Sequence, residues 1–209
     1  RTRTRLSPDV LKVRDWGSCD ITSEVSNAAQ GLRTVQEQLK RWLKSEVPSD
    51  AVVFFDHGST ELADYIVIDP ANQEVALYHA KGSSQIKPGT RLDDHRSLVD
   101  QLCRSAGLIR SGRIIDHIRD RLDSTDSFDF VVGDQGTLDD IAERPEWPVS
   151  FRFRVVGVQP GLSRRKLINA TSNSGVEDYL LAAHEWITRF DAEFEIWCSQ
   201  DETPPPGLA

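Results

Sequence analysis

Three residues on two neighbouring segments have the types and the spacing that phosphodiester hydrolysis requires. Asp64 lies at the start of the apolar stretch ADYIVID, and His79 and Lys81 lie at the end of the apolar stretch EVALYHAK. A carboxylate can hold a divalent cation that neutralises a phosphate, and a nearby lysine can orient the attacking water and stabilise developing charge. His79 and Lys81 are two residues apart on one strand, so both side chains can reach one ligand.

The two strands that carry these residues are expected to form an antiparallel hairpin. The turn-forming segment 70–72 joins them, and it is short enough to bring them side by side. Asp64 then lies opposite residues 79–81, and the three side chains converge. A purely structural ion pair between Asp64 and Lys81 would explain the charges. It would not explain why His79 and Lys81 continue the apolar face of their strand.

Further polar residues could complete such a site. Glu61 precedes Asp64 by three residues and could supply a second negative charge, or it could be a solvated turn residue. Gln101, on an expected helix over residues 92–109, could touch the substrate or the lysine. Asp94 lies seven residues earlier and faces the same way, but it equally suits the acidic first turn of this helix.

A run of three cations, Arg164, Arg165 and Lys166, follows an expected strand that ends in a Pro-Gly turn. Beside a phosphate site these residues would form a clamp for a nucleic-acid backbone; as an isolated charge run they would form a solvated loop. The net charge of −8 is unfavourable for binding nucleic acid. However, residues 152–166 contain five basic residues and no acid, which permits a local cationic surface.

The hydrophobic periodicity predicts an α/β fold, with a sheet covered by helices on both faces. The first helix is expected within residues 26–46, capped by Ser26 or Asn27. Three strands, further helices, a strand, a helix and a last strand follow. The expected strands are 51–56, 63–69, 74–81, 127–134, 150–161 and 193–199, and the expected later helices are 92–109, 112–122, 137–147 (capped by Thr137) and 176–190.

The chain length suits one domain. We expect residues 1–16 to be a basic arm or linker, residues 17–200 to form the α/β domain with an insertion at about 111–147, and residues 201–209 to be a flexible Pro-rich tail. The absence of an initiator methionine at position 1 suggests a piece of a longer protein. Three cysteines without CxxC spacing favour a reducing, cytoplasmic setting. No apolar stretch is long enough to span a membrane.

Asp64 followed by the HAK of residues 79–81 resembles the motif of the PD-(D/E)xK nucleases, which have the restriction-endonuclease-like fold. The stretch DHGSTELADYIVID…EVALYHAKGSSQIKPGTRLDD is more similar still to a nuclease domain of bacterial proteins that is often attached to DEAD/DEAH-type helicases. This resemblance implies a central mixed β-sheet flanked by helices. It also implies that Asp64 binds metal, that Lys81 is the catalytic lysine and that Ala80 binds metal through its carbonyl.

The same resemblance implies Mg²⁺ or Mn²⁺ as cofactor and DNA as substrate. It places the domain in a larger bacterial DNA-processing or defence protein, with a helicase domain in the same chain or complex, and it leaves room for a homodimer. The related nucleases often place a glutamate in the first helix. Gln36 and Glu37 both stand in this region of the chain, and the sequence does not choose between them.

His79 departs from the family pattern, which has Asp or Glu at this position. Mg²⁺ prefers oxygen ligands and imidazole suits softer metals, so we expect Mn²⁺ to support activity better than Mg²⁺. His79 could be a metal ligand, a phosphate donor or a hydrogen-bonded strand end. Glu61 could replace the missing negative charge.

The sequence therefore predicts a metal-dependent (endo)deoxyribonuclease. Its metal would be bound by Asp64, His79, Ala80 and Glu61, with Lys81 and Gln101 completing the catalytic group. The first alternative is a catalytically degenerate nuclease fold that binds nucleic acid or a protein partner. The second is an assembly domain that docks through its acidic C-terminal third. The choice between DNA and RNA, and between endonuclease and exonuclease, stays open.

Overall fold

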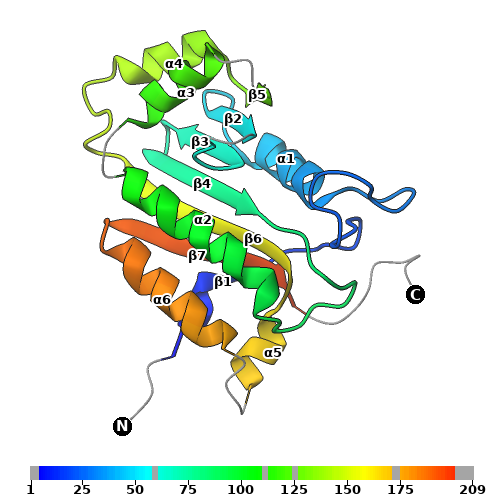
Figure 1. The fold of residues 1–209 in the computed structure, drawn as a ribbon. Coiled ribbons are helices and arrows are strands. Elements are labelled where there is room, and N and C mark those ends of the chain that lie inside the picture. Colours follow the sequence, from blue (N-terminus) through cyan, green and yellow to red (C-terminus); the bar gives the residue numbers. More distant parts are fainter. Residues whose placement is uncertain (1–4, 58–60, 110–112, 124–126, 171–174, 201–209) are drawn as a thin grey trace.

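A computed structural model describes residues 5–57, 61–109, 113–123, 127–170 and 175–200. It contains one seven-stranded mixed sheet flanked by helices (Figure 1), so the predicted α/β class is confirmed. The strands are β1 (Leu11–Val13), β2 (Val52–His57), β3 (Tyr65–Asp69), β4 (Glu74–Ala80), β5 (Ser127–Val132), β6 (Arg152–Ser163) and β7 (Ala192–Ser199). The helices are the short η1 (Pro8–Val10), α1 (Val35–Glu46), α2 (Asp93–Ile109), α3 (Ile114–Leu122), α4 (Gln135–Ala142), α5 (Arg164–Asn169) and α6 (Val176–Thr188).

The strand order of the sheet is β1-β7-β6-β4-β3-β2-β5. Strands β2, β3 and β4 form an antiparallel meander, and β6 then returns parallel to β4. In the β3/β4 hairpin Tyr65 lies opposite Tyr78. One step further along this register, Asp64 reaches the position opposite His79, as the hairpin prediction required.

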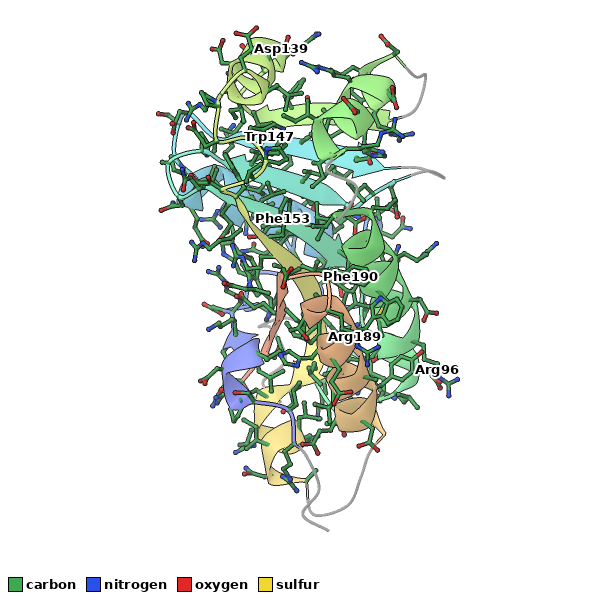
Figure 2. The ribbon with its side chains drawn as sticks, turned by 90° about the vertical axis from the view of Figure 1, so that its left-hand side faces the viewer. Arg96, Asp139, Trp147, Phe153, Arg189 and Phe190 are labelled. Carbon is green, nitrogen blue, oxygen red and sulfur yellow. The ribbon has the colours of Figure 1, made fainter. Side chains whose placement is uncertain are left out.

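The sheet separates two hydrophobic clusters. On one face, Ile66, Ile68 and Leu77 pack with residues of α2, α3, α4 and α6. On the other face, Val67 and Tyr78 pack with residues of α1. Helices α2 and α6 lie side by side across the sheet (Figure 1). The turned view shows Asp139 on α4 at one end of the molecule and Arg189 next to Phe190 where α6 ends (Figure 2).

Helix α1 begins later than the sequence indicated. Its N-cap is Thr34, not Ser26 or Asn27, and a capping box with Glu37 fixes this start. The Thr34 side chain accepts from the Glu37 backbone N–H, and the Glu37 carboxylate accepts from the Thr34 N–H, so two end-of-helix donors are satisfied together. Gly31 has a φ of 82°, which interrupts helical backbone before Thr34.

The segment expected as an N-terminal arm contributes to the sheet. β1 pairs in parallel with β7, opposite Ile196 to Cys198. Leu6, Val10 and Leu11 are buried. The described part of residues 1–16 therefore packs against the domain and is not a solvated arm, because its apolar side chains find partners on a strand that lies far away in sequence.

Two other local predictions also need correction. β6 continues through Pro160 and Gly161 to Ser163, where a turn was expected, and α5 begins directly after it. α4 is capped by Asp134, whose side chain accepts from the Thr137 N–H, so Thr137 is not the cap. The α3, β5 and α4 elements lie within the expected insertion, and β5 extends the sheet beside β2. None of the described helices is both long and apolar enough for a membrane span.

Candidate active site

Asp64 is a buried carboxylate held by two neutral donors. It lies immediately before β3 and is 2% exposed. Its Oδ1 accepts from Gln36 Nε2 at 2.8 Å, and its Oδ2 accepts from the Ala80 backbone N–H at 2.8 Å. Burial raises the pKa of Asp64 to about 7; the nearby charges of Glu61 and Glu24 act in the same direction, whereas the Ala80 N–H and Lys81 oppose it.

Helix α1 contributes Gln36 to this site, which resolves the choice that the sequence left open. Gln36 is buried, and its backbone carbonyl also accepts from the Tyr65 hydroxyl at 3.3 Å. Glu37 instead closes the capping box with Thr34. Gln36 thus forms hydrogen bonds through both its backbone carbonyl and its side-chain amide, and the side-chain amide fixes one oxygen of Asp64.

His79, at the end of β4, is buried and has one unsatisfied ring nitrogen. Its Nε2 lies 2.6 Å from Ser105 Oγ, whereas the buried Nδ1 has no hydrogen-bond partner among the described residues. Asp64 Oδ2 lies 4.0 Å from Nδ1. Burial, together with the charges of Lys81 and Arg104, lowers the pKa of His79 to about 3, whereas the Leu62 carbonyl opposes this shift. The imidazole is therefore neutral, and the 4.0 Å contact is not an ion pair.

Lys81 lies just beyond β4 and pairs with Glu24, a residue that the sequence interpretation did not single out. Lys81 Nζ is 2.9 Å from Glu24 Oε1, and the Gly82 N–H donates to Glu24 Oε2 at 3.3 Å. The charges of both Lys81 and Glu24 influence the pKa of Asp64. This partly exposed pair therefore lies beside the buried carboxylate.

Glu61 and Gln101 meet each other next to this group. Gln101 Nε2 donates to Glu61 Oε1 at 3.2 Å, and the buried Gln101 Oε1 has no hydrogen-bond partner among the described residues. Glu61 is near enough for its charge to raise the pKa of Asp64. The structure thus joins Asp64, His79 and the Ala80 backbone by close contacts. Lys81 and Glu61 lie near enough for their charges to act on the pKa of Asp64, and Gln101 contacts Glu61.

Other candidate residues lie outside this group. Asp94 accepts from Arg91 Nε at 2.8 Å and from the Ser84 N–H at 3.2 Å, so it holds the loop before α2. Arg164, Arg165 and Lys166 begin α5. β6 pairs Val158 with Ala80, has an irregularity after Val158 and ends at Ser163, so the three cations begin beyond the part of β6 that pairs with β4.

The ligand atoms available for a metal are few. Within the described ranges, no group of three or more His, Cys, Asp or Glu side chains is arranged to hold a metal ion. Asp64 and His79 offer one oxygen and one nitrogen, and the Ala80 peptide adjoins Asp64. A cation here would need the Ala80 carbonyl, water or a substrate oxygen to complete its coordination.

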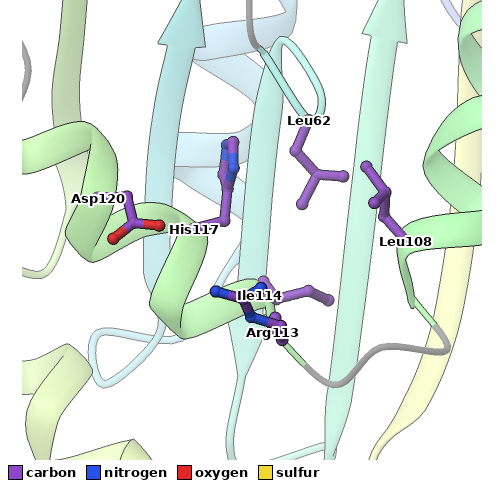
Figure 3. Close-up of a pocket in the computed structure, with 6 residues that line it drawn as sticks. All are labelled: Leu62, Leu108, Arg113, Ile114, His117 and Asp120. Atoms are coloured by element: carbon purple, nitrogen blue, oxygen red, sulfur yellow. The ribbon is translucent and has the colours of Figure 1, made fainter.

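A second buried polar group, which the sequence did not reveal, lies nearby. Asp56 at the end of β2 is fully buried; its Oδ1 accepts from Arg121 Nε at 2.6 Å, and its Oδ2 lies 2.8 Å from His117 Nε2. His117 also lines a cavity of about 190 Å³. Arg113, Ile114 and Asp120 lie with it on the α3 side of this cavity, opposite Leu62 and Leu108 (Figure 3). The spacing of His117 and Arg121, four residues apart on one helix face, was the available signal.

Comparisons with known proteins identify no relative of this chain. No family model, no curated protein and no solved structure matches it significantly.

Proposed function

We propose that this protein is a divalent-metal-dependent nuclease that hydrolyses phosphodiester bonds of DNA through the Asp64, His79 and Lys81 group, as a PD-(D/E)xK-like enzyme. One observation carries this proposal. The buried Nδ1 of His79 has no hydrogen-bond partner among the described residues, and it lies 4.0 Å from Asp64 Oδ2, which accepts from the neutral Ala80 N–H and from no hydrogen-bonded cation among those residues. An unpartnered buried nitrogen beside an uncompensated buried carboxylate is costly, and a cation between the two atoms would remove that cost.

The donor set fits a divalent cation. Asp64 supplies a hard carboxylate oxygen, and the neutral imidazole of His79 supplies a nitrogen that Mn²⁺ and later transition metals accept. The Ala80 carbonyl is the remaining protein ligand that we assign. When bound, the cation would polarise the scissile phosphate and lower the pKa of a bound water.

The residues around this position have separate tasks in the proposed reaction. Gln36 and the Ala80 N–H fix the Asp64 carboxylate from two sides, so its orientation is set before ligand binds. Lys81 would orient the attacking water and donate to a phosphate oxygen. Glu24 holds the Lys81 ammonium at 2.9 Å, and a phosphate would compete with it for this ammonium.

The order of elements supports the same family assignment. α1, β2, β3, β4, α2 and β6 follow one another as helix, three antiparallel strands, helix and a strand parallel to the third, with α3, β5 and α4 added between α2 and β6. Arg164, Arg165 and Lys166 follow β6 at the same end of the sheet as Ala80. There they would contact a neighbouring part of the same DNA backbone.

The test is nicking of supercoiled plasmid DNA in Mn²⁺ by the wild-type chain and by Asp64→Asn and Lys81→Ala. Each variant should lose at least about 100-fold in rate, the order of loss when one charge-stabilising group leaves an active site. Asp140→Asn on α4 and Lys44→Ala on α1 remove the same kinds of charge from exposed positions and should retain the wild-type rate.

Wild-type nicking rates in both site variants would refute the assignment. A wild-type chain that binds DNA and Mn²⁺ but leaves the plasmid intact would favour the alternative of a degenerate nuclease fold that acts as a binding module.

A further inference from the structure

Ser105 on α2 lies in the middle of a small buried network that includes His79. The residue is 2% exposed, and its Oγ has three close neighbours. These are the Leu62 carbonyl at 2.7 Å, the Gln101 carbonyl at 3.0 Å and His79 Nε2 at 2.6 Å. Two of the three can only accept a hydrogen bond.

This arrangement determines which nitrogen of His79 carries the proton. The Ser105 hydroxyl has a single hydrogen, and it must be donated to the Leu62 or the Gln101 carbonyl. If Ser105 instead donated to His79, its oxygen would face the Leu62 carbonyl at 2.7 Å with no hydrogen between them. The hydroxyl therefore accepts from His79, which places the hydrogen on Nε2 and leaves a lone pair on Nδ1.

The surroundings of Nδ1 agree with this assignment. A hydrogen on Nδ1 would face Asp64 Oδ2 at 4.0 Å, which is beyond hydrogen-bond distance. Nδ1 has no hydrogen-bond partner among the residues that the structure describes. The lone pair on Nδ1 and the Asp64 oxygen thus face the same space.

We infer that Ser105 is a positioning residue: it locks His79 in the Nε2-protonated tautomer, directs the Nδ1 lone pair at the metal position, and thereby makes the site select nitrogen-accepting divalent cations such as Mn²⁺ and Co²⁺ over Mg²⁺ and Ca²⁺. The inference rests on the proposed function for the existence of the metal site. Partners of metal-bound histidines generally fix the tautomer and the ring orientation in this way, and losing them costs about 10- to 100-fold in metal affinity.

The experiment is calorimetric titration of the full chain with MnCl₂ and, separately, with MgCl₂. The wild type should bind Mn²⁺ at least about tenfold more tightly than Mg²⁺. Ser105→Ala should lower the Mn²⁺ affinity about tenfold or more with little change for Mg²⁺, so the ratio of the two affinities falls. His79→Asp should bring the ratio to its lowest value, because it replaces nitrogen with a hard oxygen.

Two further variants separate positioning from folding. Ser105→Thr keeps the hydroxyl and should retain the wild-type ratio. Ser45→Ala removes a serine on α1 whose Oγ donates to the Trp42 carbonyl at 3.0 Å. That change is of the same kind at an exposed position and should leave both affinities unchanged. The ¹⁵N chemical shifts of the His79 ring in the metal-free wild type give an independent readout and should report a protonated Nε2.

The outcomes distinguish the inference from the proposed function. If the wild type binds neither metal at millimolar concentration, the metal site is absent and both proposals fall. If Asp64→Asn abolishes metal binding but Ser105→Ala leaves the Mn²⁺/Mg²⁺ ratio at the wild-type value, the site stands and the role of Ser105 is refuted. A protonated Nδ1 in the metal-free wild type would also overturn it.

Discussion

Two buried carboxylates at the ends of neighbouring strands, Asp56 and Asp64, differ in the donors that hold them. Asp56 and Asp64 are in direct backbone contact, since the Asp56 N–H donates to the Asp64 carbonyl at 3.1 Å. Asp56 is held by the guanidinium of Arg121, by His117 and by the Leu62 N–H. The side chain of Asp64 accepts from Gln36 and the Ala80 N–H, both neutral.

The difference separates a charge that is compensated within the chain from one that has no hydrogen-bonded cation among the described residues. The charge of Asp56 is compensated within the chain by Arg121, whose side chain is itself only 5% exposed. The charge of Asp64 is not compensated by a hydrogen-bonded cation among the described residues, and burial raises its pKa to about 7. An unpaired buried carboxylate either takes up a proton or binds a cation. Asp64 is therefore suited to exchange one for the other.

The largest expected effect is the difference in stability between the matched variants Asp56→Asn and Asp64→Asn. Asp56→Asn breaks the buried ion pair with Arg121 and should lower the free energy of unfolding by about 3–5 kcal/mol. Asp64→Asn removes a charge that burial disfavours, so it should lower the free energy of unfolding by no more than about 1 kcal/mol. Urea unfolding in the presence of a chelator measures both, with the exposed Asp140→Asn as control. Equal losses in the two variants would contradict the comparison.

A second prediction concerns the pH dependence of the metal-free protein. The pKa of Asp64 is about 7 in the folded state against an ordinary value of 3.8. Between these two values the folded chain holds a proton that the unfolded chain has lost, so stability falls as pH rises from about 4 to 7. At one pKa unit per 1.4 kcal/mol, this group accounts for a fall of about 4 kcal/mol at most.

The measurement is urea unfolding at several pH values for the wild type and Asp64→Asn in chelator. The difference between the two curves isolates this one group, and it should grow from pH 4 to pH 7 and then stay constant. Parallel curves over the whole range would show that Asp64 titrates normally. Because a bound cation replaces the proton, added Mn²⁺ should restore stability above pH 7 in the wild type only.

The hairpin part of the site could be predicted from the sequence because its geometry is local. Asp64 and His79 are brought together by a short turn and by the two-residue alternation of paired strands. The same alternation also predicted that Lys81 lies on the same face as His79, and this prediction does not hold. His79 contacts Ser105 on α2, whereas Lys81 contacts Glu24 in the loop before α1. β4 ends at Ala80, so Lys81 no longer obeys the alternation of the strand.

The supporting residues could not be predicted, because they reach the site across long sequence separations. Ser105 contacts His79 from a helix 26 residues away, and Glu24 contacts Lys81 across 57 residues. A serine on a helix and a glutamate in a loop carry no sequence signal for such a role. The sequence did not show that Gln36 rather than Glu37 contacts Asp64. The capping box at Thr34 engages Glu37 and fixes which face of α1 lies toward Asp64.

The smallest expected effect concerns Glu61. It tests how far a neighbouring negative charge, rather than burial alone, raises the pKa of Asp64. The negative charge of Glu61 adds to the effect of burial, as does that of Glu24. Glu61→Gln removes this charge and keeps an oxygen that can accept from Gln101 Nε2. The stability difference between a chain with Asp64→Asn and a chain without it changes with pH. When both chains also carry Glu61→Gln, the midpoint of this change should therefore lie at lower pH.

Glu143→Gln, at an exposed position after α4, is the control and should leave this midpoint in place, because its charge is not among those that act on the pKa of Asp64. If Glu61→Gln raises the midpoint instead, Glu61 does not act on Asp64 through its charge. Burial, together with the lack of a hydrogen-bonded cation among the described residues, would then be what distinguishes this carboxylate from Asp56.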